Sequence, residues 1–287
     1  MSADRPTHTP KDSHYATLRR AYRDAKPGAK PEGGDKPRGE RPSHPGKPAP
    51  EDRVRLYGLH TVAAALKNPK RKAYRLLATR NALARLEIDE AALPCPFELV
   101  EPRQLDVELG SEAVHQGVML ESAPLKPKSL QDVGESEIVL VLDQVTDPHN
   151  VGAIMRSAAA FGAGAIVTTS RHSPQESGVL AKAASGALEL VPYVQVTNLA
   201  DALQKLTERG FQTVGLDSDG EGQLETAFAG KRLALVLGAE GKGLRQKTRE
   251  TVDVLARLEV PGEIRSLNVS NAAAVALYAA RRFLAPS

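Results

Sequence analysis

The sequence predicts an α/β protein built around a parallel sheet, and two observations lead to that prediction. From Glu137 onward, short apolar runs alternate with segments of helical periodicity, which is typical of parallel β-α-β units with helices on both faces. The run at residues 138–142 is apolar throughout and short enough for a strand buried on both faces. Before Glu137 the alternating segments are shorter, so we expect a separate, smaller α/β domain there.

The small domain is expected at residues 53–122. A helix at 56–66 has apolar residues at helical spacing and ends at Asn68-Pro69. Further strands are predicted at 73–78, 97–100 and 117–120, with helices at 82–92 and 102–109. A linker with prolines and polar residues follows at 123–136.

The larger domain is expected at residues 137–287. Strands are predicted at 138–142, 165–168, 191–196, 213–216, 233–237 and 254–258. Helices are predicted at 151–161, 177–185, 199–209 and 272–283. Ligands on such sheets bind in the loops beyond the carboxyl ends of the strands, so those loops are where chemistry is sought.

Residues 1–52 hold nine prolines and five glycines and are expected to be a disordered tail. They contain 11 of the 38 Lys and Arg and 8 of the 35 Asp and Glu, so the remainder carries 27 of each and is neutral. The tail is interpreted either as a basic arm that holds RNA phosphates weakly or as a solvated leader. Any nucleic-acid surface on the folded part must therefore be a local patch.

The composition indicates a soluble cytoplasmic protein. No stretch reaches the roughly 18 uninterrupted apolar residues of a membrane span, and the polar N-terminus does not resemble a secretory signal. Cys95 is the only cysteine, which excludes an intramolecular disulfide and a cysteine-based zinc cluster.

Three loops after strands are rich in residues that a core does not need. In the first, at 142–156, Asn150 is predicted to cap a helix and Arg156 to lie on nearly the same face, so that both could point at one ligand. An ordinary cap with a surface arginine is the alternative. The second loop, at 237–244, has three glycines in six residues, but its spacing does not fit a phosphate-binding loop. The third, at 258–271, offers more small polar side chains than helix capping requires.

The three loops together resemble the motifs of the SpoU family, RNA ribose 2′-O-methyltransferases of the SPOUT superfamily. The matching elements are Asn-x5-Arg from Asn150, Leu-Gly-x-Glu-Gly-x-Gly from Leu237, and Ser-Leu-Asn-Val-Ser from Ser266. The small domain is similar to the substrate-binding domain that often precedes them. Within the family, the Thr146–Asn150 segment and the fused domain most resemble the branch that methylates guanosine in 23S rRNA; tRNA is the other substrate considered.

The resemblance implies a deep trefoil knot at the C-terminal end of the sheet, a homodimer, and S-adenosylmethionine as methyl donor. It implies that the cofactor lies against Gly238, Leu258, Gly262 and Leu267. The functional positions it assigns are Asn150, Arg156, Glu240, Ser266 and Asn268. One departure stands out, since the family commonly has proline where this chain has Glu259.

We expect a metal-free reaction in which Arg156, because a guanidinium stays protonated, stabilises the developing alkoxide instead of acting as the base. Glu240 could equally be a structural carboxylate of its loop. The alternative to an enzyme is a non-catalytic RNA-binding or ribosome-assembly factor that kept the fold. A basic cluster in the small domain is predicted to contact RNA, with a merely solvated face as the alternative: Lys67, Lys70, Arg71, Lys72 and Arg75.

Overall fold

The computed structural model describes residues 46–50, 52–264 and 266–285, which all belong to one compact unit. Most of the predicted tail lies outside the described residues. Its last described part, 46–50, contacts the small domain: the Lys47 amide donates to Val107 O at 3.3 Å and its ammonium lies 3.1 Å from Glu108 Oε1. The described structure of the small domain therefore begins earlier than Arg53, the residue at which the sequence predicted the domain to start.

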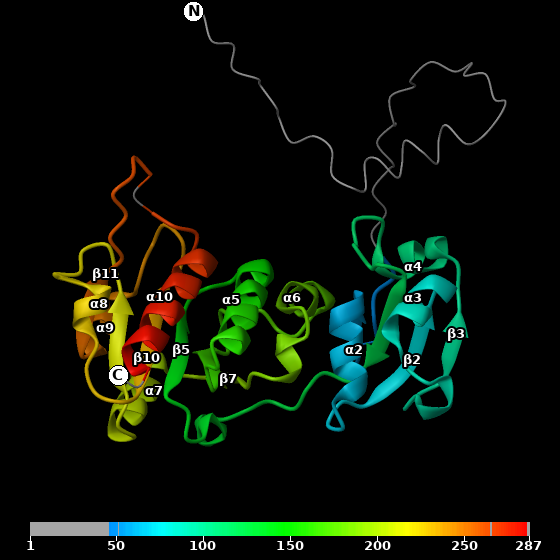
Figure 1. Ribbon diagram of the computed structural model, residues 1–287, viewed down its shortest axis with the longest axis horizontal. Coiled ribbons are helices and arrows are strands. Elements are labelled where there is room, and N and C mark those ends of the chain that lie inside the picture. The colour runs from blue at the N-terminus through cyan, green and yellow to red at the C-terminus, as the bar shows by residue number, and fades with distance from the viewer. Residues whose placement is uncertain (1–45, 51, 265, 286–287) are drawn as a thin grey trace, which may run out of the picture. The chain divides into compact units, whose positions relative to one another are not determined.

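The small domain contains a four-stranded sheet in the order β1-β4-β2-β3. Figure 1 shows β2 and β3 of this sheet with helices α2, α3 and α4. β4 pairs antiparallel with β1 and β2, and β2 pairs parallel with β3. A proline at the first turn and a capping box between Glu101 and Gln104 start α4 where the sequence predicts it. The strands are β1 (Val54–Tyr57), β2 (Ala73–Ala78), β3 (Phe97–Leu99) and β4 (Val118–Ser122), and the helices are α2 (Leu59–Lys67), α3 (Arg80–Leu86), η1 (Glu90–Ala92) and α4 (Pro102–Leu109).

The large domain contains a seven-stranded sheet in the order β7-β6-β5-β10-β8-β11-β9, with every pair of neighbours parallel. The predicted parallel α/β architecture is thereby confirmed. β10 lies between β5 and β8, both of which precede it in the chain. The strands are β5 (Ile138–Asp143), β6 (Ala165–Thr169), β7 (Tyr193–Val196), β8 (Gln212–Leu216), β9 (Gly222–Gln223), β10 (Leu233–Gly238) and β11 (Val254–Arg257).

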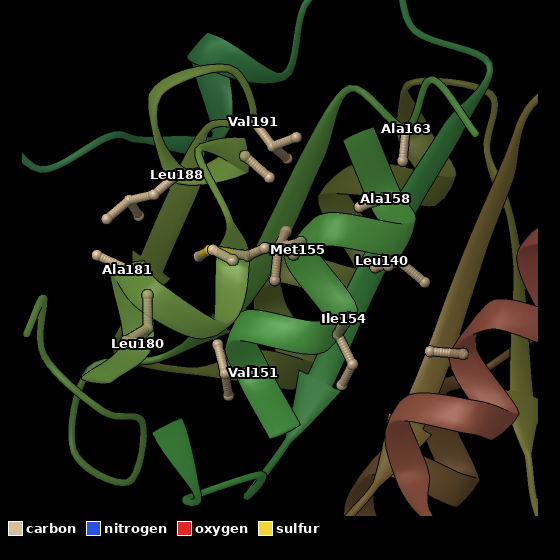
Figure 2. Close-up of a cluster of buried hydrophobic side chains, with 14 of the residues drawn as sticks. Leu140, Val151, Ile154, Met155, Ala158, Ala163, Leu180, Ala181, Leu188 and Val191 are labelled. Atoms are coloured by element: carbon tan, nitrogen blue, oxygen red, sulfur yellow. The ribbon is translucent and has the colours of Figure 1, made fainter. Parts of the chain in front are cut away.

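Helices cover both faces of this sheet because alternate residues of its central strands point to opposite sides. Leu140 of β5 belongs to the same buried cluster as residues of α5, α6 and α10, whereas Val139 and Val141 belong to the cluster that contains α7. Figure 2 shows Val151, Ile154 and Met155 of α5 among the buried side chains of the first layer. The helices are η2 (Leu130–Val133), α5 (Pro148–Ala160), α6 (Gly178–Ala184), η3 (Ala187–Glu189), α7 (Leu199–Glu208), α8 (Leu224–Ala227), α9 (Gln246–Thr251) and α10 (Val269–Leu284).

Several predicted boundaries are wrong for local reasons. The helix predicted at 56–66 begins only at Leu59, because Gly58, at φ +90°, separates it from β1. The helix predicted at 82–92 is interrupted at Glu87, which adopts a left-handed conformation with φ 52°. Asn150 does not cap α5: Asp147 does, accepting from the His149 amide at 2.9 Å, with Pro148 at the first helical position.

Candidate active site

Three side chains from the three predicted loops meet at one carboxylate oxygen. Asn150 Nδ2 donates to Glu240 Oε1 at 3.1 Å, and Asn268 Nδ2 donates to the same oxygen at 2.5 Å. Asn268 Nδ2 also lies 3.0 Å from Asn150 Oδ1. Residues 118 positions apart in the chain are thus in direct contact, so the structure brings these three predicted site residues together.

Each of the three side chains is held by the start or end of a regular element. Asn150 lies in the first turn of α5, and Glu240 follows the end of β10. Asn268 caps α10, its Oδ1 accepting from the Ser270 amide at 2.8 Å. The Val269 amide, 3.3 Å from Glu240 Oε1, brings the carboxylate to the N-terminus of α10, where the helix dipole favours negative charge.

The loop that carries Glu240 is a tight turn, and its glycines are required there. Gly241 and Gly243 have φ values of 75° and 63°, in the left-handed region that favours glycine. The Gly243 amide donates to Ala239 O at 2.9 Å and closes the turn. A Cβ on Gly238 would lie 2.1 Å from the backbone carbon of Gly243, so no other residue fits without moving the loop.

Arg156 and Ser266 are not part of this hydrogen-bonded group. Both are exposed, and no side-chain bond of theirs is found among the described residues. Asn150 and Arg156 are both helical, and six steps of about 100° place them about 120° apart around α5. The expectation that they share nearly one face is therefore wrong, although Arg156 remains free to meet a ligand.

Of the four predicted cofactor positions, Gly262 and Leu267 are exposed, whereas Gly238 and Leu258 are only partly exposed. Among the described residues, none lies within 4 Å of a Cβ built on Gly262, and Leu267 keeps 41% of its surface exposed. Leu258 is partly buried against the core, directly after β11. Glu259, the departure from the family pattern, contacts Gln223 Nε2 of β9 through its carboxylate. The third loop therefore leaves the backbone at Gly262 and the apolar side chain of Leu267 uncovered.

The sequence did not single out Asp143 and Arg245, which form an ion pair at the same edge of the sheet. Asp143, at the end of β5, is fully buried; its Oδ1 accepts from Arg245 Nε at 2.6 Å and its Oδ2 from the Arg245 amide at 3.0 Å. A charged residue ending an apolar strand was the available signal, because a buried carboxylate needs a partner.

The predicted RNA-binding cluster divides into exposed and buried members. Lys67, Lys70 and Lys72 are exposed. Arg71 is not available for RNA, because its guanidinium is fully buried and paired with Glu176 and Glu189 of the large domain. The prediction that Arg71 contacts RNA is therefore wrong.

Arg75, the fifth member of the cluster, lies in β2 of the small sheet. Its side chain is 38% exposed, and its Nε donates to Glu121 Oε2 at 2.7 Å. Arg75 is therefore largely committed to an internal ion pair.

Among the described residues, no group of three His, Cys, Asp or Glu side chains could hold a metal ion. His115 of the small domain stabilises a turn, because its Nδ1 accepts from the Gly117 amide at 3.0 Å. In the described part of the chain, no helix is long and apolar enough to cross a membrane.

Comparisons with known proteins agree with both domains. Residues 137–278 match the SpoU rRNA Methylase family, and residues 55–128 match the RNA 2'-O ribose methyltransferase substrate binding family. A 23S rRNA (guanosine-2'-O-)-methyltransferase RlmB of Pseudomonas putida is 38% identical over 239 residues, which cover 79% of this chain and 96% of that protein. The RlmB of Vibrio cholerae is 37% identical, with 79% and 96% covered.

Solved structures share the fold. An AdoMet-bound rRNA methyltransferase from Sinorhizobium meliloti superposes with a TM-score of 0.69 at 24% identity, covering 82% of this chain and 89% of that one. The SpoU methyltransferase AviRb from Streptomyces viridochromogenes, in complex with AdoMet, gives 0.67 at 22% identity, covering 81% and 90%. With both domains matched and a relative at 38% identity spanned almost completely, the predicted resemblance is confirmed and the chain belongs to the SpoU rRNA methylase family.

Proposed function

We propose that this chain is an S-adenosylmethionine-dependent methyltransferase that methylates the ribose 2′-hydroxyl of a guanosine in 23S rRNA. The observation that carries the proposal is the meeting of Asn150, Glu240 and Asn268, one from each family motif, at a single hydrogen-bonded point. The relatives named for that reaction are 37–38% identical along nearly their whole length. A non-catalytic RNA-binding factor would not need this three-way arrangement, so the arrangement favours an enzyme.

The loops around the three-residue group fit the methyl donor. S-adenosylmethionine, when bound, supplies an activated methyl group. Gly238, Leu258, Gly262 and Leu267 would hold it; of these, the exposed backbone of Gly262 and the uncovered side chain of Leu267 offer hydrogen bonds and apolar surface. The carboxylate of Glu240 accepts from both asparagine amides, and Asn268 is fully occupied by Glu240, Asn150 and Ser270. Asn150 keeps one amide hydrogen, whose direction is therefore set before the substrate arrives.

Arg156 is assigned an electrostatic role. A ribose hydroxyl is a poor nucleophile until it loses its proton, and a guanidinium cannot accept that proton at neutral pH. We infer that Arg156 grips a neighbouring phosphate and stabilises the developing alkoxide, while Asn150 and Ser266 orient the hydroxyl and water or phosphate takes the proton. Arg156→Lys is expected to lose most of its turnover, since lysine lacks the planar two-pronged donor. Near-normal turnover with an unchanged pH profile would contradict this role.

RNA is proposed to contact the exposed lysines of the small domain, Lys67, Lys70 and Lys72. Ammonium groups contribute phosphate binding without sequence preference. Specificity for one guanosine then rests on the shape of the RNA around the methyl-transfer loops.

A homodimer is also proposed, with its contact on α10. Val275, Tyr278 and Phe283 of that helix expose 43%, 57% and 41% of their surfaces, which forms an apolar face unusual for a solvated helix. Sedimentation of the purified chain is expected to give a dimer, and Tyr278→Glu a monomer; a wild-type monomer at micromolar concentration would contradict the proposal.

The knot and the location of the chain remain proposals as well. The insertion of β10 between two strands that precede it supports a threaded C-terminal segment. The lone cysteine and the similarity to rRNA methyltransferases support a cytoplasmic protein.

Mapping of 2′-O-methyl groups in total RNA from cells with and without the gene tests the function. The expected result is the loss of one 2′-O-methylguanosine from 23S rRNA, restored by the wild-type gene but not by Arg156→Ala. Loss of a methyl group from tRNA instead would assign the other substrate. An unchanged methylation map, together with no calorimetric binding of S-adenosylmethionine, would favour a non-catalytic RNA-binding factor.

A further inference from the structure

A small polar cavity lies at the carboxyl edge of the large sheet, on the α7 face. Its volume is about 100 Å³, and its walls include Thr197, Asn198, Arg245, Lys247 and Thr248. Thr197 and Asn198 follow β7 and lead into α7, whereas the other three lie at the start of α9. None of these residues belongs to the three-residue group of the active site.

Arg245 is fixed so that one end of its guanidinium stays free. The buried Asp143 takes Nε at 2.6 Å and the Arg245 amide at 3.0 Å, which locks the side chain at its base. The two terminal nitrogens have no hydrogen-bond partner among the described residues, and 42% of the side chain is exposed. An arginine anchored in this way presents two parallel donors, the geometry that suits a phosphate.

Lys247 adds a second positive charge beside the first. It is exposed, and within the described part of the chain no carboxylate lies within 4 Å of its ammonium. Asp143 neutralises one charge of the pair, so the cavity is left with an uncompensated positive charge of about one. The cavity is too small for a nucleoside, but one phosphate group fits its size and charge.

The position of the cavity connects it to the reaction. Arg245 follows Glu240 by five residues, and Asp143 precedes Asn150 by seven. Gly238 and Asp143 are paired neighbours at the ends of β10 and β5. The cavity and the active-site loops therefore lie at the same edge of the sheet, but on opposite faces. The N-terminus of α7 contributes little to anion binding in the cavity, because its Ala200 amide already donates to Asn198 Oδ1 at 3.1 Å.

We propose that this cavity, with Arg245 and Lys247, is a subsite for a backbone phosphate of the RNA substrate, flanking the nucleotide that is methylated. The inference rests on the proposed function for the identity of the RNA. It adds a phosphate contact on the large domain, whose overall charge does not itself attract nucleic acid. Because the contact is to a phosphate, it contributes affinity and register but no base preference.

The test measures RNA binding by the purified full chain as a function of salt, with wild type, Lys247→Ala and a matched control, Lys205→Ala. Lys205 is also exposed and lies in α7, away from the cavity. Lys247→Ala is expected to weaken binding of a 23S rRNA fragment about 3- to 10-fold, and to reduce the slope of log K against log salt by about 0.7 to 0.9. The control is expected to leave both unchanged, and neither variant should change the affinity for S-adenosylmethionine.

Equal affinities and slopes for Lys247→Ala and Lys205→Ala would overturn the subsite. Inorganic phosphate that binds in a Lys247-dependent manner, with the RNA slope unchanged, would make the cavity a free-anion site and overturn its assignment to RNA. Methyl transfer is assayed separately. A wild type that binds RNA but transfers no methyl group contradicts the proposed function, while the salt slopes still decide the subsite.

Discussion

Arg71 is the residue for which the structure and the sequence make opposite predictions, so its replacement discriminates between them. The guanidinium is fully buried, and its partners Glu189 and Glu176 are 4% and 11% exposed. Nη1 also donates to Ala123 O at 3.0 Å. Arg71→Met leaves two carboxylates facing each other without their shared cation, and breaking such a buried ion pair costs about 3–5 kcal/mol of unfolding free energy.

The lower half of that range is the better estimate, because each carboxylate keeps another donor. Asn68 Nδ2 lies 2.6 Å from Glu189 Oε2, and the Leu125 amide lies 2.7 Å from Glu176 Oε2. Urea unfolding of Arg71→Met is therefore expected to show a loss of about 3 kcal/mol. Adding Glu176→Gln and Glu189→Gln to Arg71→Met is expected to recover part of it, since both repelling charges are then removed.

The matched control is Lys72→Met, which removes the same charge from an exposed neighbour. It is expected to change stability by less than about 0.5 kcal/mol while weakening RNA binding. The reasoning would be refuted if Arg71→Met unfolded within about 1 kcal/mol of wild type and lost RNA affinity as the lysine variant does. That outcome would return Arg71 to the RNA surface.

Three further predictions concern the site and the core. Glu240→Gln removes the charge that orients two amides, so kcat for methyl transfer should fall about 10- to 100-fold while the affinity for S-adenosylmethionine stays unchanged. The control Glu225→Gln changes an exposed carboxylate and should match wild type in the same methyl-transfer assay. Gly262→Ala adds a methyl group that meets no described residue within 4 Å, so thermal stability should stay the same. A drop in calorimetric affinity for S-adenosylmethionine would place the ligand against residue 262, and unchanged affinity would argue that the ligand does not lie there. Burial raises the pKa of Tyr193 to about 12, so the stability that the neutral phenol contributes is present below pH 10 and is lost as the pH rises toward 12. Between pH 10 and 12 the unfolding free energy of wild type should fall about 2 kcal/mol more than that of Tyr193→Phe. Parallel curves of unfolding free energy against pH would contradict this.

The sheet and most helices could be predicted because the local signals were strong. β2 and α4 have the predicted bounds, the first from its apolar run and the second from Pro102 and its capping residues. β1 was missed because its four residues merge with the apolar pattern of α2, and only the positive φ of Gly58 separates them. β9, α8 and α9 were missed because they are too short to show a period.

Three of the predicted site residues are joined in the structure by hydrogen bonds that the sequence did not predict. The family motifs identified Asn150, Glu240 and Asn268, but the hydrogen bonds that join them depend on strand order, which periodicity does not contain. Residue type alone also could not separate Arg71 from the lysines beside it. The glutamates that bury it lie 105 and 118 positions later in the chain, and only the fold brings them there.

The central claim is that this chain transfers a methyl group to a ribose hydroxyl of guanosine. The most direct measurement incubates the purified chain with isotope-labelled S-adenosylmethionine and unmethylated 23S rRNA, digests the RNA to nucleosides and separates them by mass spectrometry. The account predicts label in 2′-O-methylguanosine, and none when Arg156→Ala replaces wild type. Label on a base, or on the ribose of another nucleoside, would contradict it.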